Sequence, residues 1–129
     1  MKLLLDTQAL IQAGLPGAPP SLPARSAKAL ADSNNELFVS VISIAELNML
    51  VRKGRLAIEP KEIQNGLAKF RVRIMPLSAD HVFRLFQLPE HHRDPFDRMI
   101  IATAIDEDMH LVGGDEQFRK YKGLKVIWR

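Results

Sequence analysis

Short apolar runs alternate with segments of helical periodicity along the whole sequence. The runs Lys2–Leu5 and Leu37–Ile42 are mostly apolar, which is typical of strands buried on both faces of a sheet. Between such runs, Ile44–Lys53 repeats apolar residues at helical spacing and ends at Gly54. Strands that alternate with helices in this way indicate an α/β fold, in which helices cover both faces of a central parallel sheet.

The same pattern divides the rest of the chain. The expected strands are Lys2–Leu5, Leu37–Ile42, Arg73–Met75, His110–Val112 and Lys125–Trp128. The expected helices are Thr7–Ala13, Ala24–Ser33, Ile44–Lys53, Lys61–Phe70, Ala79–Leu88, Phe96–Glu107 and Glu116–Tyr121. The proline-rich stretch Gly14–Pro23 is expected to be a loop. The apolar stripe of Val82 and Phe86 is most simply core, with a groove for a partner helix as the alternative.

Composition narrows the class of protein. With 129 residues, the chain is expected to form one domain, residues 1–129. It has no cysteine, which excludes disulfides, thiol catalysis and cysteine-containing zinc sites, and which fits a reducing, cytoplasmic location. The N-terminal apolar run is too short for a signal peptide or a membrane span, so we expect no membrane association. The net charge of +3 is explained by solubility, or alternatively by a polyanionic partner.

Four acids follow the ends of expected strands or begin the expected helices. Asp6 ends the first strand, Glu46 and Asp97 lie near helix starts, and Asp115 follows HLV after two glycines. The carboxyl ends of parallel strands share one edge of a sheet, where ligands bind, so these four side chains can meet there.

Helix capping is the competing interpretation of each acid. Ser43 and Glu46 match a capping box, and Asp94 followed by Pro95 is a well-formed helix start. Capping does not require an acid at all four positions, because serine, threonine and asparagine cap as well. Carboxylates that gather in one place repel each other unless a cation neutralises them, and an all-oxygen cluster suits Mg²⁺ or Mn²⁺. The residues alone leave a metal site and four separate caps as alternatives.

Four stretches together resemble the PIN domain, and within it the VapC-type toxins of bacterial toxin–antitoxin pairs. They are MKLLLDTQALI, SVISIAELNML, HRDPFDRMIIATA and LVGGDEQF, and they occur in the order of the family over nearly the whole chain. The resemblance implies a three-layer α/β/α sandwich with a central parallel sheet. It also implies an acidic pocket that binds Mg²⁺ or Mn²⁺ and an endoribonuclease that hydrolyses RNA phosphodiester bonds.

The resemblance assigns roles to the four acids. It makes Asp6, Glu46, Asp97 and Asp115 the catalytic residues, with Asp6 and Asp97 as the main metal ligands. Asp94 is then assigned to capping and Asp97 to chemistry. The family often has serine or threonine two residues before the last acid, where this chain has Gly113, so the role of Asp115 is the less secure one.

Several neighbours are candidates for supporting roles. Thr7 and Ser43 can hydrogen-bond the acids or simply begin helices, and Arg93 and Arg98 can contact RNA phosphates or pair with acids. The adjacent His91 and His92 lack the spacing of metal ligands on a helix, so both are expected to be exposed to solvent.

The resemblance further implies an RNA substrate, a cognate antitoxin and a homodimer. The alternative function is a non-catalytic RNA-binding or partner-binding module on the same fold. A dinucleotide-binding domain is excluded because no G-x-G-x-x-G follows the first strand.

Overall fold

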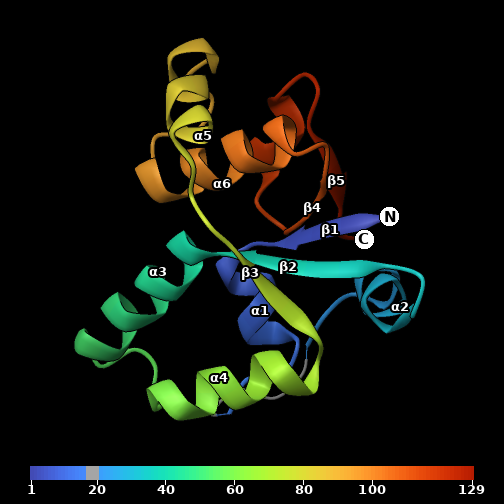
Figure 1. Ribbon diagram of the computed structural model, residues 1–129, viewed down its shortest axis with the longest axis vertical. Coiled ribbons are helices and arrows are strands. Elements are labelled where there is room, and N and C mark those ends of the chain that lie inside the picture. Colours follow the sequence, from blue (N-terminus) through green and yellow to red (C-terminus); the bar gives the residue numbers. More distant parts are fainter. Residues whose placement is uncertain (17–20) are drawn as a thin grey trace.

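Five parallel strands form one central sheet in the computed structural model, which describes residues 1–16 and 21–129 (Figure 1). The strands are β1 (Lys2–Leu5), β2 (Glu36–Ser40), β3 (Val72–Met75), β4 (His110–Val112) and β5 (Lys125–Ile127), in the order β3-β2-β1-β4-β5. The central strand β1 pairs with β2 and β4, so that Leu4 lies beside Phe38 on one side and Leu111 on the other. Because every pairing is parallel, all five strands end at the same edge of the sheet.

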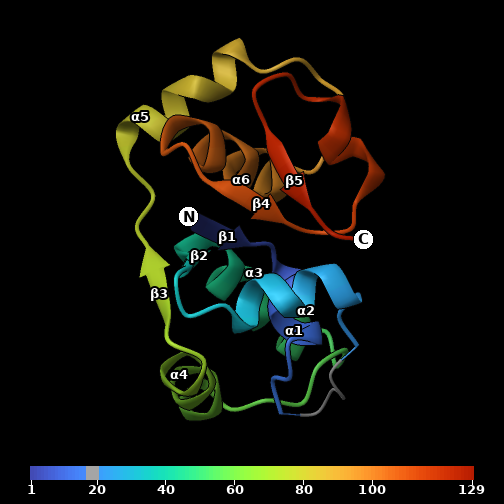
Figure 2. The same cartoon turned by 90° about the vertical axis from the view of Figure 1, so that its right-hand side faces the viewer.

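Helices cover both faces of this sheet. They are α1 (Thr7–Gln12), α2 (Ala24–Ala31), α3 (Val41–Arg52), α4 (Pro60–Lys69), α5 (Ala79–Arg84) and α6 (Pro95–Asp106), with the 3₁₀ helices η1 (Leu85–Gln87) and η2 (Glu116–Lys120). Both views show α5 and α6 on one side of the strands and α1, α2, α3 and α4 on the other (Figures 1 and 2). The expected three-layer α/β/α sandwich is therefore confirmed.

The alternation of side chains along β1 divides the core into two halves. Leu3 and Leu5 pack toward the α1–α4 side, with Val39 of β2 and Leu47 of α3 among their neighbours. Leu4 faces the other side, where it packs in a cluster with residues of α6, η2 and β4. All three leucines of β1 are completely buried, which explains why the strand is apolar at successive positions.

The boundary between β2 and α3 differs from the expected one. The strand stops at Ser40, whose hydroxyl accepts a hydrogen bond from the Ile42 N–H, and α3 begins at Val41. The expected capping box of Ser43 and Glu46 is therefore wrong, because Ser40 caps the helix. Glu46 lies in the second turn of α3, too far from its start to satisfy the first N–H groups.

The apolar stripe of α5 and η1 also differs from expectation. The sequence predicts that Val82 and Phe86 belong to the core, and this prediction is wrong, because 41% and 86% of their surfaces are exposed. His81 is the buried residue of α5; its Nε2 lies 2.9 Å from Oε1 of Glu107, which follows α6. The helix therefore docks through a polar contact of His81, and its aromatic side chains remain on the surface.

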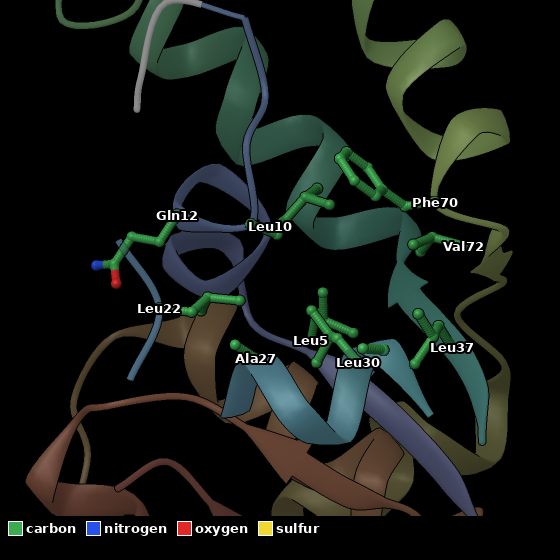
Figure 3. A pocket seen from close by; sticks show the side chains of 11 residues that line it. Leu5, Leu10, Gln12, Leu22, Ala27, Leu30, Leu37, Phe70 and Val72 are labelled. Atoms are coloured by element: carbon green, nitrogen blue, oxygen red, sulfur yellow. The ribbon is translucent and has the colours of Figure 1, made fainter. Parts of the chain in front are cut away.

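An apolar pocket of about 300 Å³ lies between α1, α2 and the first three strands (Figure 3). Leu5, Leu10, Leu30 and Leu37 line it, and Gln12 is a polar side chain at its edge. The loop expected at 14–23 includes residues 17–20, which lie outside the described residues. No helix in the described part of the chain is both long enough and apolar enough to cross a membrane.

Candidate metal centre

The four acids singled out in the sequence line one pocket of about 450 Å³ at the carboxyl ends of the strands. Asp6 follows β1, Glu46 comes from α3, Asp97 from α6, and Asp115 follows β4. Pairs of these residues are separated by up to 109 positions in the sequence, and the parallel sheet brings them together. We call this hollow the acidic pocket.

Asp6 is the most buried of these carboxylates, with 6% of its surface exposed. Its Oδ1 accepts a hydrogen bond of 2.7 Å from the Ala9 N–H and thereby caps α1. Among the described residues, no donor forms a hydrogen bond with Oδ2 of Asp6. Burial raises the pKa of Asp6 from 3.8 to about 7; the Ala9 N–H opposes this rise, and the charge of Asp97 adds to it.

Glu46 is held in the pocket by Thr7. The Thr7 hydroxyl lies 2.7 Å from Oε1 of Glu46 and 3.0 Å from the hydroxyl of Ser43. Because a hydroxyl group has only one proton, the Thr7 hydroxyl donates to Glu46 and accepts from the Ser43 hydroxyl. Burial raises the pKa of Glu46, against the lowering effect of the Thr7 hydrogen bond. Thr7 and Ser43 therefore connect the start of α1 to the carboxylate on α3.

Asp94 and Asp97 divide the two tasks expected at the start of α6. Oδ1 of Asp94 accepts hydrogen bonds from the Phe96 N–H at 2.8 Å and the Asp97 N–H at 3.4 Å, so Asp94 caps the helix. The carboxylate of Asp97 is left available to the pocket. The pKa of Asp97 is raised from 3.8 to about 6, mainly by burial and also by the charges of Asp94 and Glu46, while His92 opposes the rise.

Both carboxylate oxygens of Asp115 accept hydrogen bonds. Oδ1 accepts from the Gln117 N–H at 2.8 Å and caps η2, and Oδ2 lies 2.8 Å from Nε2 of His92. Gly113, two residues earlier, allows this close packing. A Cβ at Gly113 would stand 2.5 Å from Oδ2 of Asp6 and 2.7 Å from the Phe118 ring, so no side chain fits there without displacing the acid.

Sequence reasoning missed His92. It was expected to be exposed, but only 12% of its side chain is accessible, and its Nε2 lies 3.0 Å from Oδ2 of Asp97 as well as beside Asp115. His92, Asp97 and Asp115 form a cluster with metal-binding atom types, and no other histidine of the described chain contacts the acidic pocket. The only signal in the sequence was its position two residues before the cap of a helix.

The PIN domain profile matches residues 3–124 of the sequence. The chain belongs to the PIN domain family. The four motifs that carried the resemblance lie within or at the edge of the matched residues, and the family inferred from them is confirmed. A comparison with curated protein sequences finds no match.

Solved structures with the same fold come from toxin–antitoxin complexes. VapBC2 from Rickettsia felis, bound to a DNA fragment from its promoter, aligns over 100% of both chains with a TM-score of 0.74 and 25% identity. DNA-bound VapBC from Salmonella typhimurium covers 98% of this chain and 97% of its own, with a TM-score of 0.68 and 16% identity. A toxin–antitoxin complex from Klebsiella pneumoniae covers 97% and 95%, with a TM-score of 0.61 and 21% identity. The latter two likenesses concern the fold alone.

Two arginines of this PIN domain lie beside the start of α6. The guanidinium of Arg98 donates to the carbonyls of Leu85, Leu88, Pro89 and His92 at 3.0–3.5 Å. Arg98 thus ties the segment before α6 to the helix. Arg93 is exposed, and its expected contact with RNA phosphates stays a prediction.

Proposed function

We propose that this PIN domain is an Mg²⁺- or Mn²⁺-dependent endoribonuclease and the toxin of a toxin–antitoxin pair. The observation that carries the proposal is the acidic pocket itself, in which Asp6, Glu46, Asp97 and Asp115 converge from four elements. Burial and mutual repulsion raise the pKa values of three of them, Asp6, Glu46 and Asp97, so the pocket as it stands disfavours its own negative charge. A bound cation would relieve this repulsion.

The donor set fits a hard divalent ion. All four acids offer oxygen, the atom type that Mg²⁺ and Mn²⁺ prefer. Asp6 and Glu46 each accept a hydrogen bond from a fixed donor with one oxygen, and one oxygen of Asp97 lies beside Nε2 of His92. Within the described part of the chain, the second oxygen of each acid makes no hydrogen bond. We assign Asp6 and Asp97 as the main ligands, because they are the two acids whose pKa values are raised furthest. Glu46 and Asp115 complete the pocket.

A divalent ion, when bound, supplies activation of a water molecule and stabilisation of negative charge at phosphorus. The residues of this chain provide the rest. Asp6 and Asp97 would hold the ion, and the hydrogen bond from Thr7 fixes Glu46 in the pocket, where its carboxylate could accept a proton from water. We expect Arg93, which is exposed just before α6, to contact the phosphate backbone of RNA.

The partners and location follow from the same proposal. The toxin–antitoxin complexes among the structural neighbours support a cognate antitoxin for this chain, and the exposed Phe83 and Phe86 supply apolar surface for such a partner or for a homodimer. The absence of cysteine supports action in the cytoplasm, where RNA targets are present.

Cleavage of RNA is the direct test. Purified protein is incubated with a mixed pool of structured RNAs in Mn²⁺ or in EDTA, in parallel with Asp97→Asn. We expect cleavage that EDTA abolishes and that Asp97→Asn lowers at least about 100-fold, or about 2.7 kcal/mol of transition-state stabilisation. The matched control is Asp80→Asn, the same substitution at an exposed position of α5, which should cleave like the parent.

Two outcomes would contradict the proposal. An Asp97→Asn protein that cleaves as well as the parent would make the catalytic assignment wrong. Binding of RNA without cleavage, unchanged by EDTA, would favour the alternative of a non-catalytic module on the PIN fold. If the pool contains no substrate, melting of the parent and Asp97→Asn with and without Mn²⁺ tests the metal site separately, because only an intact site is stabilised by the ion.

A further inference from the structure

The imidazole of His92 bridges two carboxylates of the acidic pocket. Its Nε2 lies 2.8 Å from Oδ2 of Asp115 and 3.0 Å from Oδ2 of Asp97. These two acids come from different parts of the fold, the start of α6 and the segment after β4. One ring nitrogen is therefore within hydrogen-bond distance of both.

The second ring nitrogen determines where the proton of the imidazole lies. Nδ1 of His92 accepts a hydrogen bond of 3.1 Å from the Asp94 N–H, which has no other role in the cap of α6. An acceptor nitrogen carries no proton, so the proton of the ring is on Nε2. The Nε2–H group then donates to Oδ2 of Asp115, and Nε2 has no lone pair to offer a metal ion.

The imidazole ring of His92 is also held by contacts on its face and its main chain. It stacks on Phe118 with ring centres 6.0 Å apart and ring planes 28° apart, and Phe118 is completely buried. The His92 N–H donates to the hydroxyl of Tyr121 at 2.8 Å. Main chain, ring face and Nδ1 are all held, so the direction of Nε2–H is set before any ligand binds.

We propose that His92 is a positioning residue, which orients the carboxylates of Asp97 and Asp115: its Nε2–H donates to Oδ2 of Asp115 and lies beside Oδ2 of Asp97. The inference rests on the metal centre of the proposed function, and it goes beyond the four acids assigned there. A donor between two carboxylates reduces their repulsion, and by holding Oδ2 of Asp97 on one side it leaves Oδ1 of Asp97 for the pocket. Groups that hydrogen-bond metal ligands in this way commonly contribute about 10–100-fold to metal affinity.

Titration of the metal-free protein with Mn²⁺ in a calorimeter measures this contribution. We expect His92→Ala to weaken Mn²⁺ binding by about 10–100-fold. His92→Gln, whose amide N–H can replace the Nε2–H donor, should recover most of the affinity. The matched control is His91→Ala: the adjacent histidine is exposed, its ring forms a T-shaped pair with Tyr121, and within the described chain it makes no hydrogen bond or ion pair with the acids.

The outcomes separate the two proposals. A parent protein that binds no Mn²⁺ would overturn the metal centre and, with it, the role of His92. A parent that binds Mn²⁺ while His92→Ala binds it equally well would overturn the role of His92 alone. A loss in His92→Ala that His92→Gln does not recover at all would contradict a donor role, because the glutamine keeps the donor.

The tautomer is observable in the parent protein without metal. The chain has four histidines, so long-range ¹H–¹⁵N spectra of the ¹⁵N-labelled parent resolve four rings, and His92→Gln assigns the signal of His92. We expect a ring protonated on Nε2, with Nδ1 at the shift of an acceptor. A ring protonated on Nδ1, with Nε2 free, would overturn the proposal and would make His92 a metal ligand instead.

Discussion

Individual carboxylates in this protein serve two purposes at once. Asp6 and Asp115 were weighed in the sequence as either caps or site residues, and each of them caps a helix with one oxygen while it lines the acidic pocket. Asp97 differs, because Asp94 satisfies the N–H groups at the start of α6. One carboxylate can therefore both cap a helix and line the pocket. Capping is ruled out only where, as at Asp97, a neighbouring residue already caps the helix.

The buried charge of Asp6 should make the metal-free protein less stable as the pH rises. The folded protein keeps this proton up to about pH 7, whereas the unfolded chain releases it near pH 3.8, so the free energy of unfolding falls between about pH 4 and pH 7. Asp6→Asn keeps the capping oxygen and removes the charge. We expect it to raise the free energy of unfolding by on the order of 1–3 kcal/mol at pH 8 and by less at pH 5, where the parent has lost only the first part of this stability.

Urea unfolding of EDTA-treated proteins at the two pH values checks this prediction. Asp80→Asn, an exposed control, should keep the pH dependence of the parent. Some dependence will remain in Asp6→Asn because the pKa of Asp97 is raised as well. Equal slopes for the parent and Asp6→Asn would show that the carboxylate of Asp6 is ionised at no cost in the folded protein.

The sequence was sufficient to find the four acids but not His92. An acid directly after an apolar strand lies at a position that the topology of a parallel sheet fixes, so Asp6 and Asp115 could be placed without a structure. His92 precedes a helix in an irregular segment, and its partner Asp115 is 23 residues away. No local pattern encodes the packing on Phe118 that turns its ring into the pocket.

At the scale of elements, the boundary predicted from the sequence was wrong where an apolar run suits both a strand and a helix. Val41 and Ile42 continue the apolar run of β2 and also suit the first turn of α3, and the run alone does not distinguish them. The Ser40 hydroxyl caps the helix at this point, so Val41 and Ile42 belong to α3. On α5, periodicity identified a helix correctly but gave the wrong face, because the buried His81 is polar and the exposed Phe86 is apolar.

The junction of β4 with the acidic pocket leaves no space for a side chain at Gly113. In Gly113→Ala, the added Cβ would meet Oδ2 of Asp6 at 2.5 Å and the buried Phe118 ring at 2.7 Å. The strand end itself is held, because the Gly113 N–H donates to the Ile127 carbonyl. We expect a loss of about 1–3 kcal/mol of stability by overpacking, and a smaller rise of melting temperature on addition of Mn²⁺, because Asp6 is displaced.

Gly66→Ala is the matched control for this substitution. Its Cβ would meet the flexible end of Leu15 at 2.9 Å, and Gly66 lies inside α4, where alanine favours the helix. The free energy of unfolding of Gly66→Ala should stay within about 1 kcal/mol of the parent. Urea unfolding measures the stability of both variants, and thermal melting with and without Mn²⁺ measures their response to the ion. Full stability and full response to Mn²⁺ in Gly113→Ala would contradict the tight packing against Asp6.

At the scale of the whole molecule, the alternation of expected strands and helices along the sequence was sufficient to predict the fold class. It predicted the layers and the parallel sheet, and these place the carboxyl ends of all strands at one edge. It did not predict the order of the strands, which depends on how the connections cross the sheet. The central position of β1 matters for function, because it puts Asp6 between the residues that follow β2 and those that follow β4.

Expression of the chain in a bacterial host tests the molecule as a toxin. A ribonuclease whose RNA target is essential should stop growth soon after induction, and the arrest should require the acidic pocket. We therefore expect Asp97→Asn to grow normally at equal expression, and the exposed control Asp80→Asn to arrest growth like the parent. Co-expression of the protein encoded beside it should restore growth if that protein is the antitoxin, and the two should copurify. A toxic Asp97→Asn would instead mean that the surface of the fold acts by binding, since binding alone does not need the carboxylate at the start of α6.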